Sequence, residues 1–383
     1  MENQFLECAF LVQVDFKEFD SHNSLKELRA LTESAGAKIV GSLQAKRTAP
    51  DAKFFIGKGK MEELKTQVLA TQATLVIFNH TLSATQERNI ARFLNVRVID
   101  RNTLILDIFA LRAQSFEGRL QVELAQLTHL ATRLVGTWTH LERQKGGIGL
   151  RGPGERQLEI DRRLLAQRVK YLNARLSKLE KSRQTQRGST FRKSAFNVSL
   201  VGYTNAGKST LFNALTHEKV YSADQLFATL DTTSRKLWLE QAQESMVLTD
   251  TVGFIRNLPH ALVKAFHATL EVSVEADLLL HVIDFSSPVY EDECAAVNAV
   301  LKEIGADSIP QLLVLNKTDL KEDCARFQNN DLNADFEKNS TFTVENRLKL
   351  PNRIFLSAKN GDGLENLRQI LAQYAICKRQ TFI

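Results

Sequence analysis

The chain has 383 residues, with 50 Lys+Arg and 44 Asp+Glu, so its formal net charge at pH 7 is +6. Hydrophobic residues make up 43% and charged residues 25%, which is typical of a soluble globular protein and excludes collagen-like and wholly disordered chains. No apolar run approaches the roughly 18 residues that a membrane-spanning helix needs. The start, Met1 to Gln4, lacks the basic and apolar regions of a signal peptide. The length allows two domains.

The four cysteines, Cys8, Cys294, Cys324 and Cys377, lie far apart and form no C-x-x-C pair. This spacing fits neither a disulfide framework nor a zinc site, and it indicates a reducing compartment. We therefore expect a cytoplasmic protein.

The positive charge is concentrated in one segment. Residues 143–193 hold 15 Lys+Arg and 4 Asp+Glu, a local net charge of +11, whereas the rest of the chain has 35 basic and 40 acidic residues, a net charge of −5. Such a segment favours a surface that faces a polyanion, although a solvated charged helix would have the same composition.

Residues 1–110 alternate β-type runs with amphipathic stretches, which predicts an N-terminal α/β subdomain with a largely parallel sheet. Ser83, followed three residues later by Gln86, predicts a capping box at a helix start. Gly57-Lys58-Gly59-Lys60 either contacts phosphate or RNA or forms a simple helix-entry turn. The expected strands are 10–14, 74–78 and 97–99, and the expected helices are 24–33 and 84–93.

Residues 111–193 have the leucine spacing of a coiled-coil seam. Leucines, with Ala131 in one position, recur at intervals of four and three residues over 120–134, and leucines recur every seven residues over 158–179. Two such helices joined by a short connection should form an antiparallel helical hairpin. The connection, 146–154, contains five glycines and a proline, so we expect no helix there and a tip that can lie close to phosphate. The polar stretch 182–194 is interpreted as a linker.

From residue 194 to residue 383 the strand–loop–helix pattern returns and predicts a doubly wound α/β domain. The polar stretch 321–351 is interpreted as a surface insertion. The expected strands are 197–201, 246–248, 278–283, 311–315 and 353–356, and the expected helices include 209–216, 259–271 and 294–304.

Residues 202–209 match the P-loop pattern G-x-x-x-x-G-K-[ST] at every fixed position, between a predicted strand and a predicted helix. Backbone N–H groups of such a loop surround the β- and γ-phosphates of a nucleotide. Lys208 would supply a positive charge to those phosphates, and Ser209 would ligate Mg²⁺. The nucleotide-binding residues predicted here are Gly202, Tyr203, Thr204, Asn205, Ala206, Gly207, Lys208 and Ser209.

Three further strings, each after a predicted strand, indicate guanine nucleotides. In the first string, at 250–253, Asp250 can hold Mg²⁺ through water and the N–H of Gly253 can reach the γ-phosphate. In the second string, at 316–319, the Asp319 carboxylate can accept hydrogen bonds from guanine N1–H and the 2-amino group. In the third string, at 357–359, a backbone N–H can donate to guanine O6. The strings are Asp250-Thr251-Val252-Gly253, Asn316-Lys317-Thr318-Asp319 and Ser357-Ala358-Lys359. Their order and spacing predict a GTPase domain.

The first switch loop should lie between Lys208 and Asp250. Its candidate nucleotide contacts are Phe227, Ala228, Thr229, Leu230 and Asp231, and Thr229 is the predicted second Mg²⁺ ligand, with Thr233 as the rival. We expect Lys208, Thr229 and Gly253 to take part in catalysis.

Two residues of the predicted site bear on how water is oriented and on whether a potassium ion binds. Phe254 follows Gly253 where many GTPases carry a glutamine that orients water, so this chain must organise water in another way. Asn205 either binds a potassium ion, as in GTPases that use K⁺, or is an asparagine tolerated in a tight loop.

Several strings resemble the HflX family of GTPases. They are the glycine-rich segment 146–155 with 157–159 and 161–163, and the segments 121–127, 227–231 and 250–254. The resemblance covers nearly the whole chain. It implies a GTPase that binds the ribosome, chiefly the large subunit and its RNA, and acts in splitting or rescue of stressed ribosomes or in ribosome biogenesis.

With this resemblance we expect GTP and GDP as ligands, Mg²⁺ with K⁺ as a further candidate ion, no DNA partner and a monomeric chain. The alternative from another class is a nucleotide-binding RNA scaffold or assembly factor whose hydrolysis is incidental. The chain departs from the family pattern at Thr232, where proline is usual, and at Arg156 and Ile160, where threonines are common. Longer members continue into a further small C-terminal domain, whereas the sequence here ends at Ile383, so contacts expected of that domain are not carried over.

Overall fold

The computed structural model describes residues 7–16, 21–137, 153–187, 196–216, 226–227, 230, 232–256, 273–321 and 351–381. Contacts between residues divide the chain into two compact units, of which the first extends to Leu179 and the second begins at Glu180. Each unit has its own sheet and core. The domain boundaries expected from the sequence, at 110/111 and 193/194, stay a prediction.

The first unit contains a four-stranded parallel sheet in the order β2-β1-β3-β4. The strands are β1 (Cys8–Phe16), β2 (Lys38–Arg47), β3 (Leu75–Phe78) and β4 (Arg97–Asp100). The three strands expected in this region are confirmed as β1, β3 and β4. The sequence did not indicate β2, because this edge strand buries few side chains and lacks a continuous apolar run.

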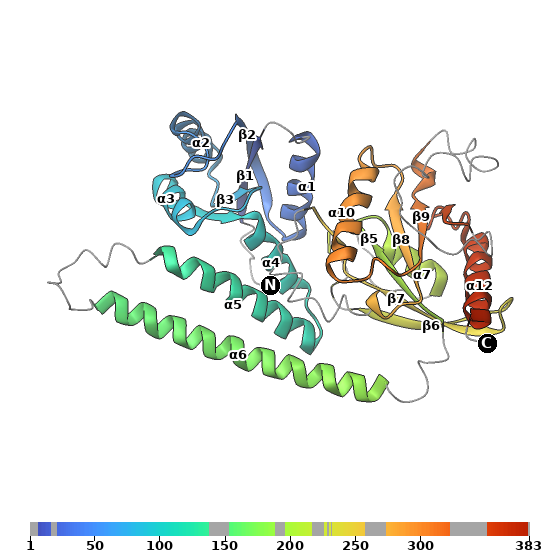
Figure 1. Cartoon of the computed structure of the whole chain (residues 1–383). Helices are drawn as coiled ribbons and strands as arrows, with labels where there is room; N and C mark the ends of the chain where they lie inside the picture. Colours follow the sequence, from blue (N-terminus) through green and yellow to red (C-terminus); the bar gives the residue numbers. More distant parts are fainter. Residues whose placement is uncertain are drawn as a thin grey trace, which may run out of the picture. The chain divides into compact units, whose positions relative to one another are not determined.

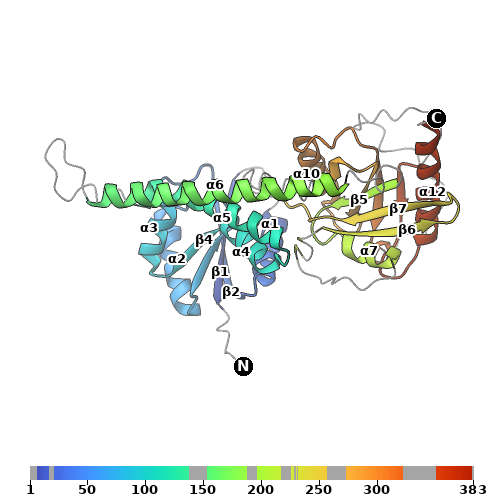
Figure 2. The same ribbon diagram turned by 90° about the horizontal axis from the view of Figure 1, so that it is seen from below.

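Four helices cover this sheet, with α1 and α4 on one face and α2 and α3 on the other (Figures 1 and 2). The capping box of α3 is confirmed, since Ser83 accepts a hydrogen bond from the N–H of Gln86 and the Gln86 side chain accepts one from the N–H of Ser83. Helix α2 begins directly after Gly57, so the Gly57–Lys60 string forms a helix entry. The helices are α1 (Ser21–Ser34), α2 (Lys58–Thr71), α3 (Ala84–Leu94) and α4 (Arg101–Arg112).

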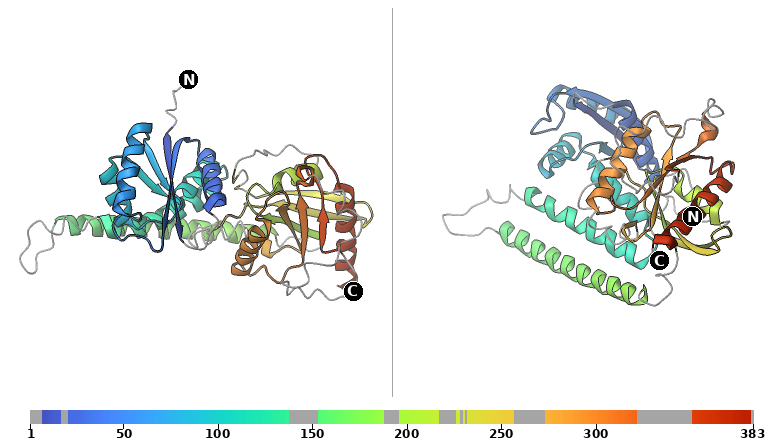
Figure 3. Two further views of the ribbon diagram at one scale, coloured as in Figure 1. Left: turned by 90° about the horizontal axis from the view of Figure 1, so that it is seen from above. Right: turned by 45° about the vertical axis from the view of Figure 1, so that its right-hand side comes forward.

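Helices α5 (Phe116–Thr137) and α6 (Pro153–Arg187) lie side by side as the predicted antiparallel hairpin (Figures 1 and 3). The leucine seam is their interface: Leu120, Leu172 and Leu176 are buried, and other leucines pack around them. Two expectations were wrong. Residues 153–154 are helical rather than part of the connection, because proline suits the first turn of a helix. Residues 182–187 continue α6 instead of forming a linker. The tip, 146–152, lies outside the described residues.

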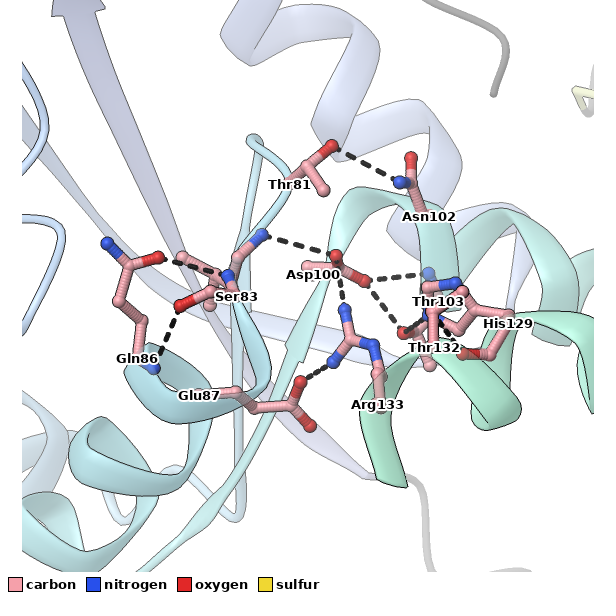
Figure 4. Close-up of polar contacts among 11 residues, drawn as sticks. Thr81, Ser83, Gln86, Glu87, Asp100, Asn102, Thr103, His129, Thr132 and Arg133 are labelled. Atoms are coloured by element: carbon pink, nitrogen blue, oxygen red, sulfur yellow. Dashed lines mark hydrogen bonds and ion pairs between the residues drawn. The ribbon is translucent and has the colours of Figure 1, made fainter. Parts of the chain in front are cut away.

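Helix α5 is attached to the sheet by a buried ionic cluster at the end of β4 (Figure 4). Asp100 is fully buried and accepts hydrogen bonds from the Thr103 N–H at 2.9 Å and from Arg133 Nη2 on α5 at 2.6 Å. Arg133 also forms an ion pair with Glu87 of α3. One arginine is therefore paired with two carboxylates from two elements, which fixes the end of α5 that leads towards the tip.

The second unit contains a six-stranded sheet in the order β10-β9-β8-β5-β7-β6, in which only β6 is antiparallel to its neighbour. The strands are β5 (Phe196–Gly202), β6 (Thr233–Leu239), β7 (Glu244–Asp250), β8 (Leu278–Asp284), β9 (Gln311–Asn316) and β10 (Arg353–Phe355). All five expected strands are confirmed. The edge strand β6 was missed because most of its side chains are at least partly exposed.

Helices cover both faces of this sheet, which confirms the doubly wound fold (Figure 2). Helices α7 (Lys208–Thr216) and α12 (Leu364–Thr381) share one hydrophobic core with the strands. Helix α10 (Tyr290–Glu303) packs on the other face through Cys294. The helix expected at 259–271 and nearly all of the insertion at 321–351 lie outside the described residues.

In the part of the chain that the structure describes, no helix has the length and hydropathy needed to cross a membrane. Cys8, Cys294 and Cys377 carry free thiols.

Candidate nucleotide-binding site

The predicted P-loop connects β5 to α7 at the centre of the sheet, next to the carboxyl ends of β7 and β8. At such a point the strand order reverses, and open α/β sheets bind ligands there. Gly202 and Gly207 both have positive φ, +149° and +93°. A Cβ on Gly202 would lie 2.2 Å from the Val282 carbonyl oxygen, and one on Gly207 would lie 2.3 Å from Asn316 Nδ2. Only glycine fits at these two positions.

Lys208 points back into the loop that carries it. Its Nζ donates hydrogen bonds to the carbonyl oxygens of Tyr203 at 2.7 Å and Gly202 at 3.0 Å, and the side chain is buried. Burial lowers the pKa of Lys208 to about 8, although the nearby carboxylate of Asp250 opposes this shift. An anion placed in the loop would stabilise the charged form of this lysine, which is the form that binds phosphate.

The two predicted magnesium contacts lie together. Ser209 Oγ, in the first turn of α7, donates a hydrogen bond of 2.8 Å to Asp250 Oδ2 at the end of β7. Hydroxyl and carboxylate oxygens suit Mg²⁺, which is commonly held by one or two protein groups together with substrate phosphates. Among the described residues no three His, Cys, Asp or Glu side chains gather into a group that could hold a metal ion.

The segment after Asp250 is joined to the P-loop by two backbone hydrogen bonds. The N–H of Thr204 donates to the Phe254 carbonyl at 2.7 Å, and the N–H of Phe254 donates to the Gly202 carbonyl at 3.1 Å. Gly253 is held so close that a Cβ on it would lie 3.0 Å from Lys208 Nζ. Phe254 is 2% exposed and packs into the protein, where it holds the segment in place.

Asn316, at the end of β9, links two loops of the site. Its Nδ2 donates to the Ala206 carbonyl in the P-loop at 2.9 Å, and its Oδ1 accepts from the N–H of Ala358 at 2.9 Å. Thr251 has a similar supporting role, because its hydroxyl donates to the Leu200 carbonyl in β5. These buried side chains position the loops and leave backbone groups available to a ligand.

The residues predicted to recognise the base are held by hydrogen bonds from neighbouring side chains. Asp319 Oδ1 accepts a hydrogen bond of 2.6 Å from the Ser357 hydroxyl, which orients the carboxylate. Lys317, with φ +62°, donates from Nζ to Asp284 Oδ2 at 2.7 Å. Of the other predicted contacts, Val252 is buried, Thr318 begins a short 3₁₀ turn and Lys359 is exposed, and their roles stay predictions.

The first switch is described only in part. Phe227 and Leu230 are buried, whereas Ala228, Thr229 and Asp231 lie outside the described residues. Thr233, the rival magnesium ligand, is the first residue of β6 and lies opposite Asp250 in the strand register. The roles of Thr229 and Thr233 stay predictions. Asn205 is exposed and has φ +61°.

Asp284 is a candidate site residue that the sequence reasoning missed. It ends β8 in register with Asn316 of β9, and it orients Lys317 while accepting hydrogen bonds from the N–H and hydroxyl of Ser286. The available signal was the carboxylate directly after the buried run 278–283, at the edge where parallel strands place ligands.

Comparison with protein families gives three adjoining matches. Residues 22–110 match the family described as GTP-binding GTPase N-terminal, residues 112–189 match the GTP-binding GTPase Middle Region, and residues 197–317 match the 50S ribosome-binding GTPase family. Together these matches cover most of the chain.

Individual relatives are similar over almost the whole length. The GTPase HflX of Escherichia coli is 52% identical over 96% of this chain and 82% of its own length. The GTPase HflX of Caldanaerobacter subterraneus is 47% identical over 95% of this chain and 80% of its own length. Among solved structures, the crystal structure of SsGBP in complex with GDP covers 96% of this chain and 98% of its own, with 26% identity and a TM-score of 0.52.

Proposed function

Because this chain belongs to the HflX family of GTPases, we propose that it binds the large ribosomal subunit and hydrolyses GTP there, in splitting or rescue of stressed ribosomes or in ribosome biogenesis. We further propose that it acts as a monomer in the cytoplasm and does not bind DNA. The observation that carries the proposal is the arrangement of Lys208, Ser209, Asp250 and Asp319 in one GTPase site, together with a hairpin of high positive charge.

In this proposal the nucleotide site works largely through positioning and charge. Lys208 would exchange its bonds to the Gly202 and Tyr203 carbonyls for bonds to the phosphates, because phosphate is the stronger acceptor for an ammonium group. The N–H of Gly253 would donate to the γ-phosphate, and Asp319 would accept from the guanine ring. Buried Phe254 cannot hydrogen-bond water, so the backbone around it and the first switch would orient the attacking water.

Magnesium would be held by Ser209 and, through water, by Asp250, with Thr229 as the ligand from the first switch. Bound there, the ion neutralises charge that develops on the phosphates.

Potassium dependence tests the proposed role of Asn205. Its exposed side chain lies on the P-loop, where a monovalent cation could add positive charge beside the phosphates. We expect GTP turnover in potassium chloride to exceed turnover in sodium chloride of the same ionic strength, and Asn205→Ala to remove the difference. Equal turnover of the native protein in both salts would rule out a potassium site.

Ribosome binding is supported by two observations. The second unit matches a family described by binding to the 50S ribosome, and residues 143–193 have a net charge of +11 while the rest of the chain is net negative. A basic segment gains affinity for RNA by releasing the counterions of its phosphates. The glycine-rich tip at 146–154 would allow the backbone to approach RNA closely.

The decisive measurement is GTP turnover with and without purified large ribosomal subunits. We expect the subunits to increase turnover at least about tenfold, because subunit binding would order the switches around Thr229 and Gly253. Small subunits and naked RNA at the same phosphate concentration are the controls. If large subunits bound the protein but left turnover unchanged, the chain would instead be an RNA scaffold or assembly factor with incidental hydrolysis.

A further inference from the structure

The flank of the hairpin beside the leucine seam carries an exposed aromatic and basic stripe. On α6, residues at spacings of four and three share this face, which is the spacing of one side of a helix. All of them are exposed, including Tyr171 at 49%. We call this set, together with Phe116 of α5, the hairpin flank. The α6 residues of the flank are Leu164, Arg168, Tyr171, Arg175 and Lys178.

Guanidinium groups and aromatic rings alternate along the hairpin flank. The Arg175 guanidinium lies 4.8 Å from the centre of the Phe116 ring on α5 and 5.9 Å from the centre of the Tyr171 ring, and its Nη1 donates to the Tyr171 hydroxyl at 2.8 Å. Arg168 lies 5.4 Å from the Tyr171 ring on the other side and forms an ion pair with Glu123 of α5 at 2.6 Å. The order along the flank is therefore Phe116, Arg175, Tyr171, Arg168.

The two rings add little to the core of the hairpin. The core cluster consists of leucines, and neither ring belongs to it. Phe116 is 52% exposed although it is a large apolar side chain. Aromatic rings held in place by arginine and left open to solvent are the surface on which proteins stack unpaired nucleobases.

The charge around the hairpin flank favours RNA over a protein or membrane partner. Exposed basic side chains on α6 include Lys178 of the flank and Lys181, and both lie in the segment whose net charge is +11. RNA is a polyanion with flat, apolar bases, so it can interact with both the basic side chains and the exposed rings of this surface. An acidic peptide would interact only with the basic side chains.

We propose that the hairpin flank is a stacking site for unpaired RNA bases, in which Tyr171 and Phe116 stack on bases and Arg175 and Lys178 hold the adjacent phosphates. The proposal rests on the proposed function, since it names the form of RNA that the hairpin binds. It places this contact on the body of the hairpin, separate from the tip at 146–152.

A short single-stranded RNA that contains 2-aminopurine tests the proposal with the full chain. This base loses fluorescence when it stacks, so quenching reports stacking and the titration reports affinity. We expect quenching with the native protein. Affinity should fall by about tenfold in Phe116→Ala and again by about tenfold in Tyr171→Ala, and Tyr171→Phe should bind like the native protein.

Matched controls separate stacking from charge and from general apolar contact. Arg163→Gln/Lys170→Gln removes two exposed charges of α6 that lie outside the flank and should weaken binding without changing the quenching. Leu69→Ala removes an exposed apolar side chain on α2 and should have no effect.

Three results would overturn the proposal: no quenching by the native protein, unchanged affinity and quenching in Phe116→Ala/Tyr171→Ala, or equally tight binding of a fully paired RNA duplex. Ribosome-stimulated GTP turnover, measured in parallel, distinguishes these results from a failure of the proposed function. Stimulation without stacking would leave the proposed function in place and reject the hairpin flank as a stacking site.

Discussion

Replacement of Lys208 by alanine is expected to reduce GTP hydrolysis by roughly a hundredfold to a thousandfold, the cost of removing one donor that stabilises transition-state charge. Ser209→Ala should have a comparable effect through loss of the Mg²⁺ ligand. The physical reason is that both side chains lie on the phosphate loop, where Lys208 Nζ already forms hydrogen bonds with two loop carbonyls and Ser209 Oγ lies 2.8 Å from Asp250 Oδ2. Single-turnover hydrolysis at saturating GTP measures the effect.

Two controls make this experiment specific. Lys302→Ala removes an exposed lysine on α10 of the same unit and should leave hydrolysis unchanged. Raising the Mg²⁺ concentration should partly rescue Ser209→Ala but not Lys208→Ala, because only the serine is a proposed metal ligand. If Lys208→Ala folded normally and hydrolysed GTP at the native rate, residues 202–209 would not be the phosphate-binding loop.

Asp319→Asn should weaken GTP binding by about a hundredfold or more and reduce discrimination against ATP. The carboxylate, oriented by the Ser357 hydroxyl at 2.6 Å, would accept two hydrogen bonds from guanine, and a hydrogen bond to a charged group contributes about 1.5–3 kcal/mol. Equilibrium binding of fluorescent GTP and ATP analogues measures both effects.

Xanthosine triphosphate provides the complementary control for Asp319→Asn. Xanthine carries an oxygen where guanine carries its 2-amino group, so the asparagine N–H can donate to it and binding should recover. Glu303→Gln, a neutralised exposed carboxylate on α10, should bind GTP as the native protein does. Native GTP affinity in Asp319→Asn would contradict the assignment of the base-recognition loop.

The sequence predicted the elements whose burial produces a clear periodic pattern. Strands β1, β5 and β8 were found because most of their residues are buried and they are rich in apolar and β-branched side chains, and the hairpin was found because its leucines repeat at helical spacing. The edge strands β2 and β6 were missed. Much of an edge strand faces solvent, so its residues carry little hydrophobic signal and its pairing depends on neighbours distant in the chain.

The candidate site could be predicted only where a residue is expected to contact the ligand directly. Lys208, Asp250 and Asp319 belong to short strings that the chemistry of a nucleotide requires, and the structure brings their loops together. The supporting contacts could not be predicted. Asp284 orients Lys317 across two strands, and Arg133 joins α5 to Asp100 across 33 residues, so both contacts depend on the register of the fold.

Asn316 couples the positions of two loops of the candidate nucleotide site. One buried amide holds the Ala206 carbonyl in the phosphate loop and the Ala358 N–H in the base loop, each at 2.9 Å. Glycine at position 207 allows this amide to approach the loop backbone so closely. Neither loop can shift far without breaking a hydrogen bond to the same buried side chain, and an unsatisfied buried amide is costly. The loops predicted to bind the purine and the phosphates are thus tied to one buried side chain, so a displacement of either loop disturbs the amide that holds the other.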